Sequence, residues 1–292
     1  MNAADRLAAR VGIPLESRFF EAAAGRLHCK VAGSGPPLLL IHGLNIGWGQ
    51  WHEVVAPLAA KFTVYAIDLP GAGESVKPDF LTADMPALML DAVDAALREF
   101  CPTGALVAGH SVGGWAALRL AADRHPAIRK VVAVDAMGFT DFVPPRYWAL
   151  AWRPSARLLA AKLVPPTRRN LEDFLNSVTA IKTPLAAEYV DYFFEHVNRA
   201  PTAHPFLLIH SLFRPGAVRI RPELVLSPAE LGDIICPTVI AHGAADPLIP
   251  LRSVRPAFAA VRGSKEVIFD GVGHALPLEF PSGFVRLIMD AA

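Results

Sequence analysis

The sequence of 292 residues contains little cysteine, and its cysteines form no recognisable pattern. Cys29, Cys101 and Cys236 are odd in number, widely spaced and without a C-x-x-C pair. This pattern favours small buried side chains in a reducing compartment over a disulfide framework or a zinc site. We therefore expect no metal site in this protein.

Long apolar runs and an excess of charge are also missing. Although 53% of the residues are hydrophobic, no stretch approaches the ~18 consecutive apolar residues that a membrane helix needs. Residues 1–18 carry early charges and no apolar run, which is not typical of a secretory signal. The 28 basic and 27 acidic residues include no basic block of the kind that marks nucleic-acid binders. We expect a cytoplasmic protein with a small-molecule substrate and no nucleic-acid or membrane partner; a homodimer stays open.

No nucleotide-binding loop is present. Residues 68–75 (Asp-Leu-Pro-Gly-Ala-Gly-Glu-Ser) lack a third glycine after Gly71 and Gly73, so the dinucleotide fingerprint fails. A G-x-x-x-x-G-K-[ST] phosphate loop is absent as well. We interpret residues 68–75 as a tight structural loop that leaves a strand.

What the sequence does contain is a rhythm of short apolar runs and helical stretches. Runs apolar on both faces predict buried parallel strands at residues 38–41, 63–67, 105–108, 130–134, 238–241 and 266–269. Helical patterns lie between them at residues 83–100, 112–124, 253–261 and 281–289. Residues 18–22 and 26–31 predict a leading antiparallel hairpin. The alternation predicts an α/β fold with a doubly wound, mostly parallel sheet.

The rhythm breaks over residues 138–228, which are rich in aromatics and punctuated by prolines. We predict about four short helices there, inserted into a core formed by residues 1–137 and 229–292. These helices are interpreted as a cap over a cleft at the carboxyl ends of the strands, where open α/β sheets bind ligands. A helical extension with no role in binding is the alternative.

Residues 109–113 (Gly-His-Ser-Val-Gly) match G-x-S-x-G, the motif that presents a nucleophilic serine on a sharp strand-to-helix turn. A predicted strand precedes the motif and a predicted helix follows it, as the turn requires. Small flanking residues suit its strained backbone and the close approach of the helix. Ser111 is therefore the candidate nucleophile.

A serine hydroxyl needs a base, and the base needs an orienting acid. In this arrangement the acid and then the histidine follow the serine along the chain. Asp246 and His274 each lie just beyond a predicted strand, on the edge where Ser111 projects. Asp135, at the end of another strand, is a rival for the acid.

The oxyanion of a tetrahedral intermediate needs preorganised donors. We predict the backbone amides of Val112, directly after the nucleophile, and Leu44, in the loop after residues 38–41. Further substrate contacts are predicted for side chains of that loop and of the cap, with core packing as the alternative for both tryptophans: Asn45, Trp48, Trp51 and Phe139.

Five segments together resemble the α/β-hydrolase superfamily, in particular its capped members: HG at 42–43, DLPGAGES at 68–75, GHSVGG at 109–114, HGAADPLIP at 242–250 and GHALPLEFP at 273–281. The resemblance runs from about residue 18 to the end, and the cap matches only in position and character. It implies an eight-stranded sheet, a helical lid, no cofactor, and hydrolysis of esters or related bonds.

Ser111 separates the chain from the haloalkane dehalogenases and epoxide hydrolases of that superfamily, which carry aspartate at this position. The meta-cleavage-product hydrolases commonly have tryptophan after the base, where this chain has Ala275. We expect a serine hydrolase that cleaves an ester, lactone or thioester of a medium-sized hydrophobic substrate through an acyl-enzyme. Carbon–carbon hydrolysis is one alternative, and a ligand-binding receptor or pseudoenzyme on the same fold is another.

Overall fold

The computed structural model describes residues 1–181, 184–199 and 204–292, and eight of its strands form a single sheet. Their order across the sheet is β1-β2-β4-β3-β5-β6-β7-β8. Strands β1 and β2 form an antiparallel hairpin, β2 pairs antiparallel with β4, and the remaining pairs are parallel. The strands are β1 (Glu16–Ala22), β2 (Gly25–Ala32), β3 (Pro37–Ile41), β4 (Thr63–Asp68), β5 (Ala105–His110), β6 (Ile128–Val134), β7 (Thr238–Gly243) and β8 (Lys265–Phe269). The predicted α/β fold and eight-stranded sheet are confirmed.

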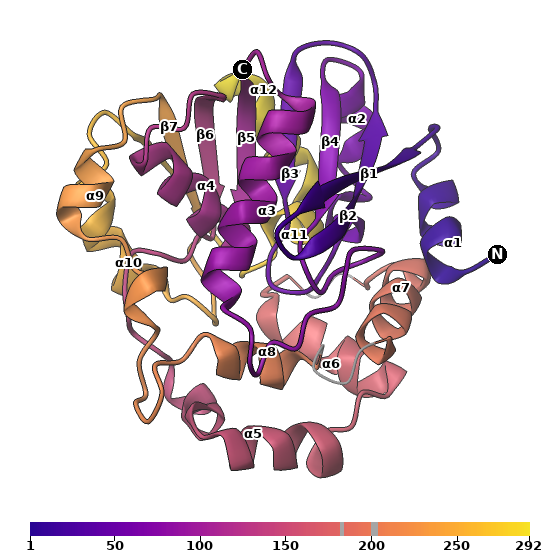
Figure 1. Ribbon diagram of the computed structural model, residues 1–292, viewed down its shortest axis with the longest axis vertical. Helices are drawn as coiled ribbons and strands as arrows, with labels where there is room; N and C mark the ends of the chain where they lie inside the picture. Colours follow the sequence, from indigo (N-terminus) through magenta and orange to yellow (C-terminus); the bar gives the residue numbers. More distant parts are fainter. Residues whose placement is uncertain (182–183, 200–203) are drawn as a thin grey trace.

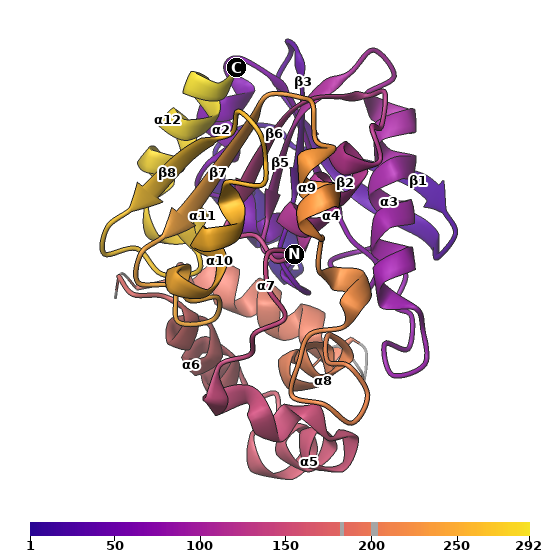
Figure 2. The same ribbon diagram turned by 90° about the vertical axis from the view of Figure 1, so that its left-hand side faces the viewer.

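Helices cover both faces of the sheet, and this explains why its central strands read as continuous apolar runs. On β3, Leu39 and Ile41 pack into the core beside α3 (Met85–Phe100) and α4 (Val112–Ala122), whereas Leu38 and Leu40 pack into the core beside α2 (Val55–Ala59) and α12 (Pro281–Ala291). Successive side chains of a strand point to opposite faces, so a strand buried on both sides must be apolar throughout. Figure 2 shows the sheet between these two helical layers.

Along the chain, a helical insertion, residues 153–211, follows β6 and precedes β7. It lies at one end of the sheet (Figure 1). It contains α5 (Arg153–Leu158), a π-helical turn η3 (Leu159–Leu163), α6 (Arg168–Val178), α7 (Ala187–Asn198) and α8 (Pro205–Ser211). The short helices η2 (Pro145–Ala151) and η4 (Pro222–Leu224) flank it in the chain. Residues 182–183 and 200–203 of the expected cap lie outside the described residues. In the described ranges, no helix combines the length and apolar composition needed to cross a bilayer.

The remaining helices are short and lie in the core. They are η1 (Trp48–Trp51), α9 (Pro228–Gly232), α10 (Leu251–Phe258) and α11 (Leu276–Glu279). Helix α1 (Ala3–Arg10), which the apolar pattern did not indicate, packs on α7 of the insertion. Its first residue Ala3 donates its backbone N–H to Glu195 at 3.2 Å. The amino-terminal helix therefore braces the insertion from the side.

Trp48 and Trp51 lie on η1, next to the predicted oxyanion loop, and both are buried in the core beneath it. The Trp51 ring is fully buried, with its centroid 5.4 Å from that of Phe284 on α12. The Trp48 ring contacts Tyr192 of α7 at 5.7 Å between centroids. The packing alternative holds for both tryptophans, because neither side chain faces open space.

Replacing Trp51 should destabilise the fold through a cavity rather than through any change at the surface. We expect Trp51→Ala to lower the free energy of unfolding by about 3–5 kcal/mol, as buried large-to-small aromatic substitutions do. Urea unfolding followed by circular dichroism measures the loss. Trp152→Ala is the matched control, because its indole is 51% exposed and surface changes usually stay within about 0.5 kcal/mol. Equal losses for the two variants would contradict this assignment.

Candidate active site

Ser111 stands between the end of β5 and the start of α4, with a backbone that few non-glycine residues adopt. Its φ is 54° and its ψ is −115°. A side chain at positive φ costs free energy, and such residues persist where the surrounding structure dictates their conformation. Here β5 is buried along its whole length and α4 packs directly behind it. The turn therefore holds the hydroxyl at the carboxyl edge of the sheet.

Glycines on both sides of Ser111 let α4 approach the sheet. A Cβ on Gly113 would lie 2.3 Å from the carbonyl oxygen of Ile41, and one on Gly109 would lie 2.2 Å from the carbonyl oxygen of Gly113. Both distances are too short for a carbon atom. The two glycines of G-x-S-x-G are thus required by close backbone contact.

His274 and Asp246 converge on Ser111 from loops after β8 and β7. The Nε2 of His274 lies 3.1 Å from the Ser111 Oγ, and its Nδ1 lies 2.7 Å from the Oδ2 of Asp246. All three side chains are buried. The other Asp246 oxygen accepts the amides of Leu248 and Ile249 at 2.7 and 2.8 Å. The structure therefore brings the three predicted residues into one hydrogen-bonded chain.

Charge around His274 favours its protonated form more than an ordinary environment would. Burial is the largest single influence on this imidazole and lowers its pKa, but the charge and hydrogen bond of Asp246 and the charges of nearby carboxylates together raise it, so the net pKa lies above its usual value. Burial would conversely raise the pKa of Asp246, yet the His274 ring and the amides lower it overall. The carboxylate stays charged and can stabilise an imidazolium that forms when Ser111 loses its proton.

Asp135, the rival acid, is buried beside this chain but does not orient the imidazole. One of its oxygens accepts the Gly243 amide at 2.8 Å, and the other has no hydrogen-bond partner among the described residues. Burial and the neighbouring Asp246 charge raise the pKa of Asp135 well above its usual value. A neutral carboxyl group suits this position, and Asp246 alone bonds to His274 Nδ1.

Asp135, His242 and Asp246 also place three possible metal-ligand atoms within 4.8 Å of one another. These groups already have protein partners. His242 Nε2 donates to the carbonyl of Ile249 at 2.8 Å, and the Asp246 oxygens hold His274 and two amides. The present geometry of Asp246 serves the orientation of His274, and that of Asp135 holds the Gly243 amide.

Glu279, which the sequence analysis did not single out, holds the loop that carries His274. Its carboxylate accepts the amides of Gly273 and Ala275, the two neighbours of His274, each at 3.0 Å. It also accepts the amides of Ala180 and Ile181 from the insertion, each at 2.8 Å. The His274 amide donates to the Val178 carbonyl at 2.9 Å. One buried carboxylate thus ties the histidine loop to the end of α6.

His110, the variable residue of G-x-S-x-G, supports the same loop from the other side. Its Nε2 donates to the carbonyl oxygen of His274 at 2.5 Å. Burial lowers the pKa of His110 to about 3, so the ring is neutral at physiological pH. The G-x-S-x-G motif predicted where His110 lies. It could not predict a hydrogen bond to a residue 164 positions away in the sequence.

The loop after β3, which carries the predicted oxyanion donor, borders the site. Leu44 and Asn45 both line the pocket, and Asn45 has a positive φ of 55°. His196 of α7 donates from Nε2 to the Asn45 side-chain oxygen at 2.6 Å. Burial lowers the pKa of His196 to about 3, so it is neutral. A neutral histidine of the insertion therefore contacts the oxyanion loop.

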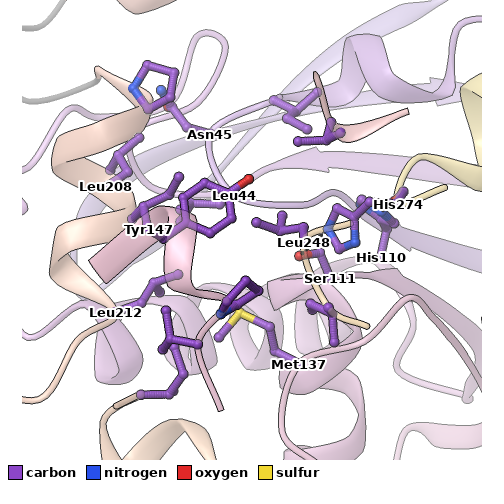
Figure 3. Close-up of a pocket in the computed structure, with 18 of the residues that line it drawn as sticks. Leu44, Asn45, His110, Ser111, Met137, Tyr147, Leu208, Leu212, Leu248 and His274 are labelled. Atoms are coloured by element: carbon purple, nitrogen blue, oxygen red, sulfur yellow. Dashed lines mark hydrogen bonds between the residues drawn. The ribbon is translucent and has the colours of Figure 1, made fainter. Parts of the chain in front are cut away.

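A largely apolar pocket opens in front of Ser111. The space between its side chains amounts to about 1060 Å³, open mouth included. Figure 3 shows Ser111, His110 and His274 on one side, with Tyr147, Leu208 and Leu212 on the opposite side. Met137, Leu248 and Leu44 complete the labelled apolar wall (Figure 3). The core supplies the reactive groups, and the insertion with the residues that flank it supplies much of the surface that a substrate would meet.

Three predicted substrate contacts are not part of this pocket. Trp48 and Trp51 are core residues, and Phe139 is 7% exposed and packs against Phe258 of α10 at 4.9 Å between centroids. Gly138 and Thr140, its chain neighbours, do line the pocket. The segment around Phe139 lies at the pocket, as predicted. The Phe139 side chain itself points into the core.

The loop of residues 68–75 has the structural role expected of it. Asp68 is fully buried and accepts His28 Nδ1 at 2.7 Å and the Trp48 amide at 2.6 Å. Burial would raise the pKa of this carboxyl, but the His28 hydrogen bond and charge lower it to about 2. A Cβ on Gly73 would lie 1.8 Å from an Asp68 oxygen, so glycine is required there.

Known proteins are similar to this chain in sequence and in fold. A pimeloyl-[acyl-carrier protein] methyl ester esterase of Vibrio vulnificus is 27% identical over 271 residues, covering 91% of this chain and 98% of the relative. A carboxylesterase structure from Bacillus subtilis superposes with a TM-score of 0.79 at 20% identity, covering 99% and 95% of the two chains. A 2-hydroxy-6-oxo-6-phenylhexa-2,4-dienoate hydrolase structure from Rhodococcus gives 0.76 at 22% identity, covering 95% and 99%.

Because both structures are less than 25% identical to this chain, their likeness establishes the fold alone. The match to a whole family is broader. The sequence profile described as the alpha/beta hydrolase family matches residues 38–287, which include Ser111, Asp246 and His274. This chain belongs to the alpha/beta hydrolase family.

Proposed function

We propose that this protein is a serine esterase that cleaves a carboxylic ester, lactone or thioester of a medium-sized hydrophobic substrate. The observation that carries the proposal is the hydrogen-bonded chain Ser111–His274–Asp246 at the wall of an apolar pocket. Relatives named as esterases, which align over nearly the whole chain, support the reaction class. An apolar wall with few polar groups favours an apolar acyl or alcohol part.

The proposed reaction is acyl transfer in two halves. His274 Nε2 takes the proton of Ser111 as Oγ attacks the carbonyl carbon, and the resulting oxyanion accepts the amides of Val112 and Leu44. The leaving alcohol departs with the proton from His274. Water then loses a proton to His274 and attacks the acyl carbon, which releases the acid and restores Ser111. Asp246 stabilises the imidazolium in both halves.

Reactivity of Ser111 separates the esterase from a binding protein that uses the same pocket. We expect a fluorophosphonate probe to label the wild type, and Ser111→Ala to abolish labelling and reduce ester hydrolysis by ~10⁴-fold or more. Ser177→Ala on α6 is the matched control, because its exposed hydroxyl bonds only within its own helix. Gel fluorescence and p-nitrophenyl ester assays measure the two effects. An unlabelled but folded wild type would favour the receptor or pseudoenzyme.

A substrate panel separates ester hydrolysis from the carbon–carbon alternative, because both reactions use the same serine and histidine. We expect turnover of p-nitrophenyl esters and lactones with medium-length acyl groups to exceed that of a ring-fission diketone at least tenfold in kcat/KM. Ala275, at the position after the base, gives no tryptophan of the kind expected for carbon–carbon hydrolases. Preference for the diketone would reverse the assignment within the same fold.

Glu279 should act as a positioning residue for His274 and should also set its pKa. Its negative charge raises the pKa of His274, so Glu279→Gln should lower that pKa. Because the base acts in its neutral form, activity falls as pH drops below this pKa. The acid limb of kcat/KM should therefore move to lower pH in the variant, while kcat at its plateau falls about tenfold through loss of charge-assisted bonds.

The control for that measurement is Glu99→Gln, which removes an exposed carboxylate near the end of α3. Its profile should coincide with that of the wild type. A merely structural role of Glu279 would lower the folded fraction without moving the acid limb. An unshifted limb with a fully folded variant would count against the positioning role.

A further inference from the structure

One segment of the chain carries positive charge without any negative charge. Residues 142–171 contain six basic residues and no acidic one, leaving 22 basic and 27 acidic residues for the rest of the chain. The net charge of the whole chain, +1, is therefore the sum of a basic segment and an acidic remainder. This segment comprises η2, α5 and η3 together with the start of α6.

The inner side of this segment is buried against α8. Leu150, Ala156 and Ala160 belong to a small apolar core with Leu207 and Phe213. Figures 1 and 2 place α5 at the end of the molecule farthest from the sheet. The opposite side of the segment therefore faces outward from the tip of the insertion.

Large apolar side chains are exposed along this segment. Trp148, Trp152, Leu158 and Leu163 are 47%, 51%, 48% and 63% exposed. Arg153, Arg157 and Lys162 alternate with them and are exposed too. We call these seven residues the outer face. Of these residues, Arg157 also lines a hollow beside α7 and α8, whereas the four apolar side chains line none of the described pockets.

The three cations of the outer face have no ion pair within the described part of the chain. Neighbouring basic residues differ in this respect. Arg168 pairs with Glu172 and Asp191, and Arg169 lies 4.0 Å from Asp173. Positive charge on the outer face is thus left for an external partner.

We propose that the outer face binds the surface of an anionic lipid bilayer. Tryptophan and leucine side chains flanked by arginine and lysine are the composition that peripheral helices use to insert between headgroups while pairing with anionic lipids. Projecting apolar side chains suit a soft layer that closes around them, whereas a protein partner would need preformed pockets for each. The earlier expectation of no membrane partner considered only spanning segments, and surface binding needs none.

The outer face adjoins the mouth of the pocket. Phe142 lines the pocket and is 40% exposed, and Trp148 Nε1 donates to the carbonyl of Val143, another lining residue, at 3.0 Å. A bilayer bound here would lie beside the route by which an apolar ester reaches Ser111. Delivery of substrate from the lipid rests on the proposed function, but lipid binding itself does not.

Co-sedimentation with vesicles tests the proposal without using catalysis. We expect the wild type and Ser111→Ala alike to bind phosphatidylglycerol-containing vesicles and not pure phosphatidylcholine vesicles, with binding reduced by added salt. Loss of two cations in Arg153→Gln/Arg157→Gln should weaken the partition coefficient on the order of 25-fold, at about fivefold per charge. Trp152→Ser/Leu158→Ser should weaken it at least tenfold by removing the inserted apolar area.

Ile235→Ser/Arg262→Gln is the matched control. It removes one exposed apolar and one exposed basic side chain from the surface near α9, outside the insertion. Its partition coefficient should equal that of the wild type. No binding of folded wild type to anionic vesicles would overturn the proposal. Binding to soluble polyglutamate without binding to vesicles would also overturn it and assign the outer face to an acidic protein. Vesicle binding with no probe labelling would instead reject only the esterase function.

Discussion

The hydrogen bond between His274 Nδ1 and Asp246, 2.7 Å long and buried, is the interaction on which the proposed chemistry of this protein depends. It selects the tautomer that leaves Nε2 as an acceptor facing Ser111, and it keeps a carboxylate charged where burial alone would neutralise it. The Asp246 side chain is fully buried, so its oxygens must be satisfied by the protein. Two backbone amides satisfy the second Asp246 oxygen and hold the carboxylate in place.

The histidine is positioned by the insertion as much as by the sheet. Glu279 gathers four amides, two beside His274 and two beyond α6, into one buried cluster. On the opposite side of the pocket, His196 of α7 contacts Asn45 of the oxyanion loop. Movement of the insertion would therefore displace both His274 and the loop that carries the predicted oxyanion donor. Pocket shape and catalytic geometry are physically linked through these contacts.

Sequence patterns succeeded where a local rule had only one structural solution. Buried parallel strands read as short apolar runs, and all six were placed within two residues of their observed bounds. Gly109 and Gly113 had to be glycine because α4 approaches the sheet too closely for a Cβ. The same rules place Ser111, Asp246 and His274 beyond the ends of parallel strands, which meet at one edge of a sheet. Helix α1 was missed because a short amphipathic helix leaves a weak apolar signal.

By itself, the sequence determined the fold class, the turn at Ser111 and the chain order of the three converging residues, because strand periodicity and glycine sterics are local properties. Only the tertiary structure decided that Asp246 and not Asp135 orients His274, that Trp48, Trp51 and Phe139 pack inward, and that Glu279 serves the histidine loop. Each of these depends on which face a side chain takes and which distant amides it meets. Burial, and hydrogen bonds such as those from Ala180 and Ile181 to Glu279, are set by packing of the whole chain, so no local pattern encodes them.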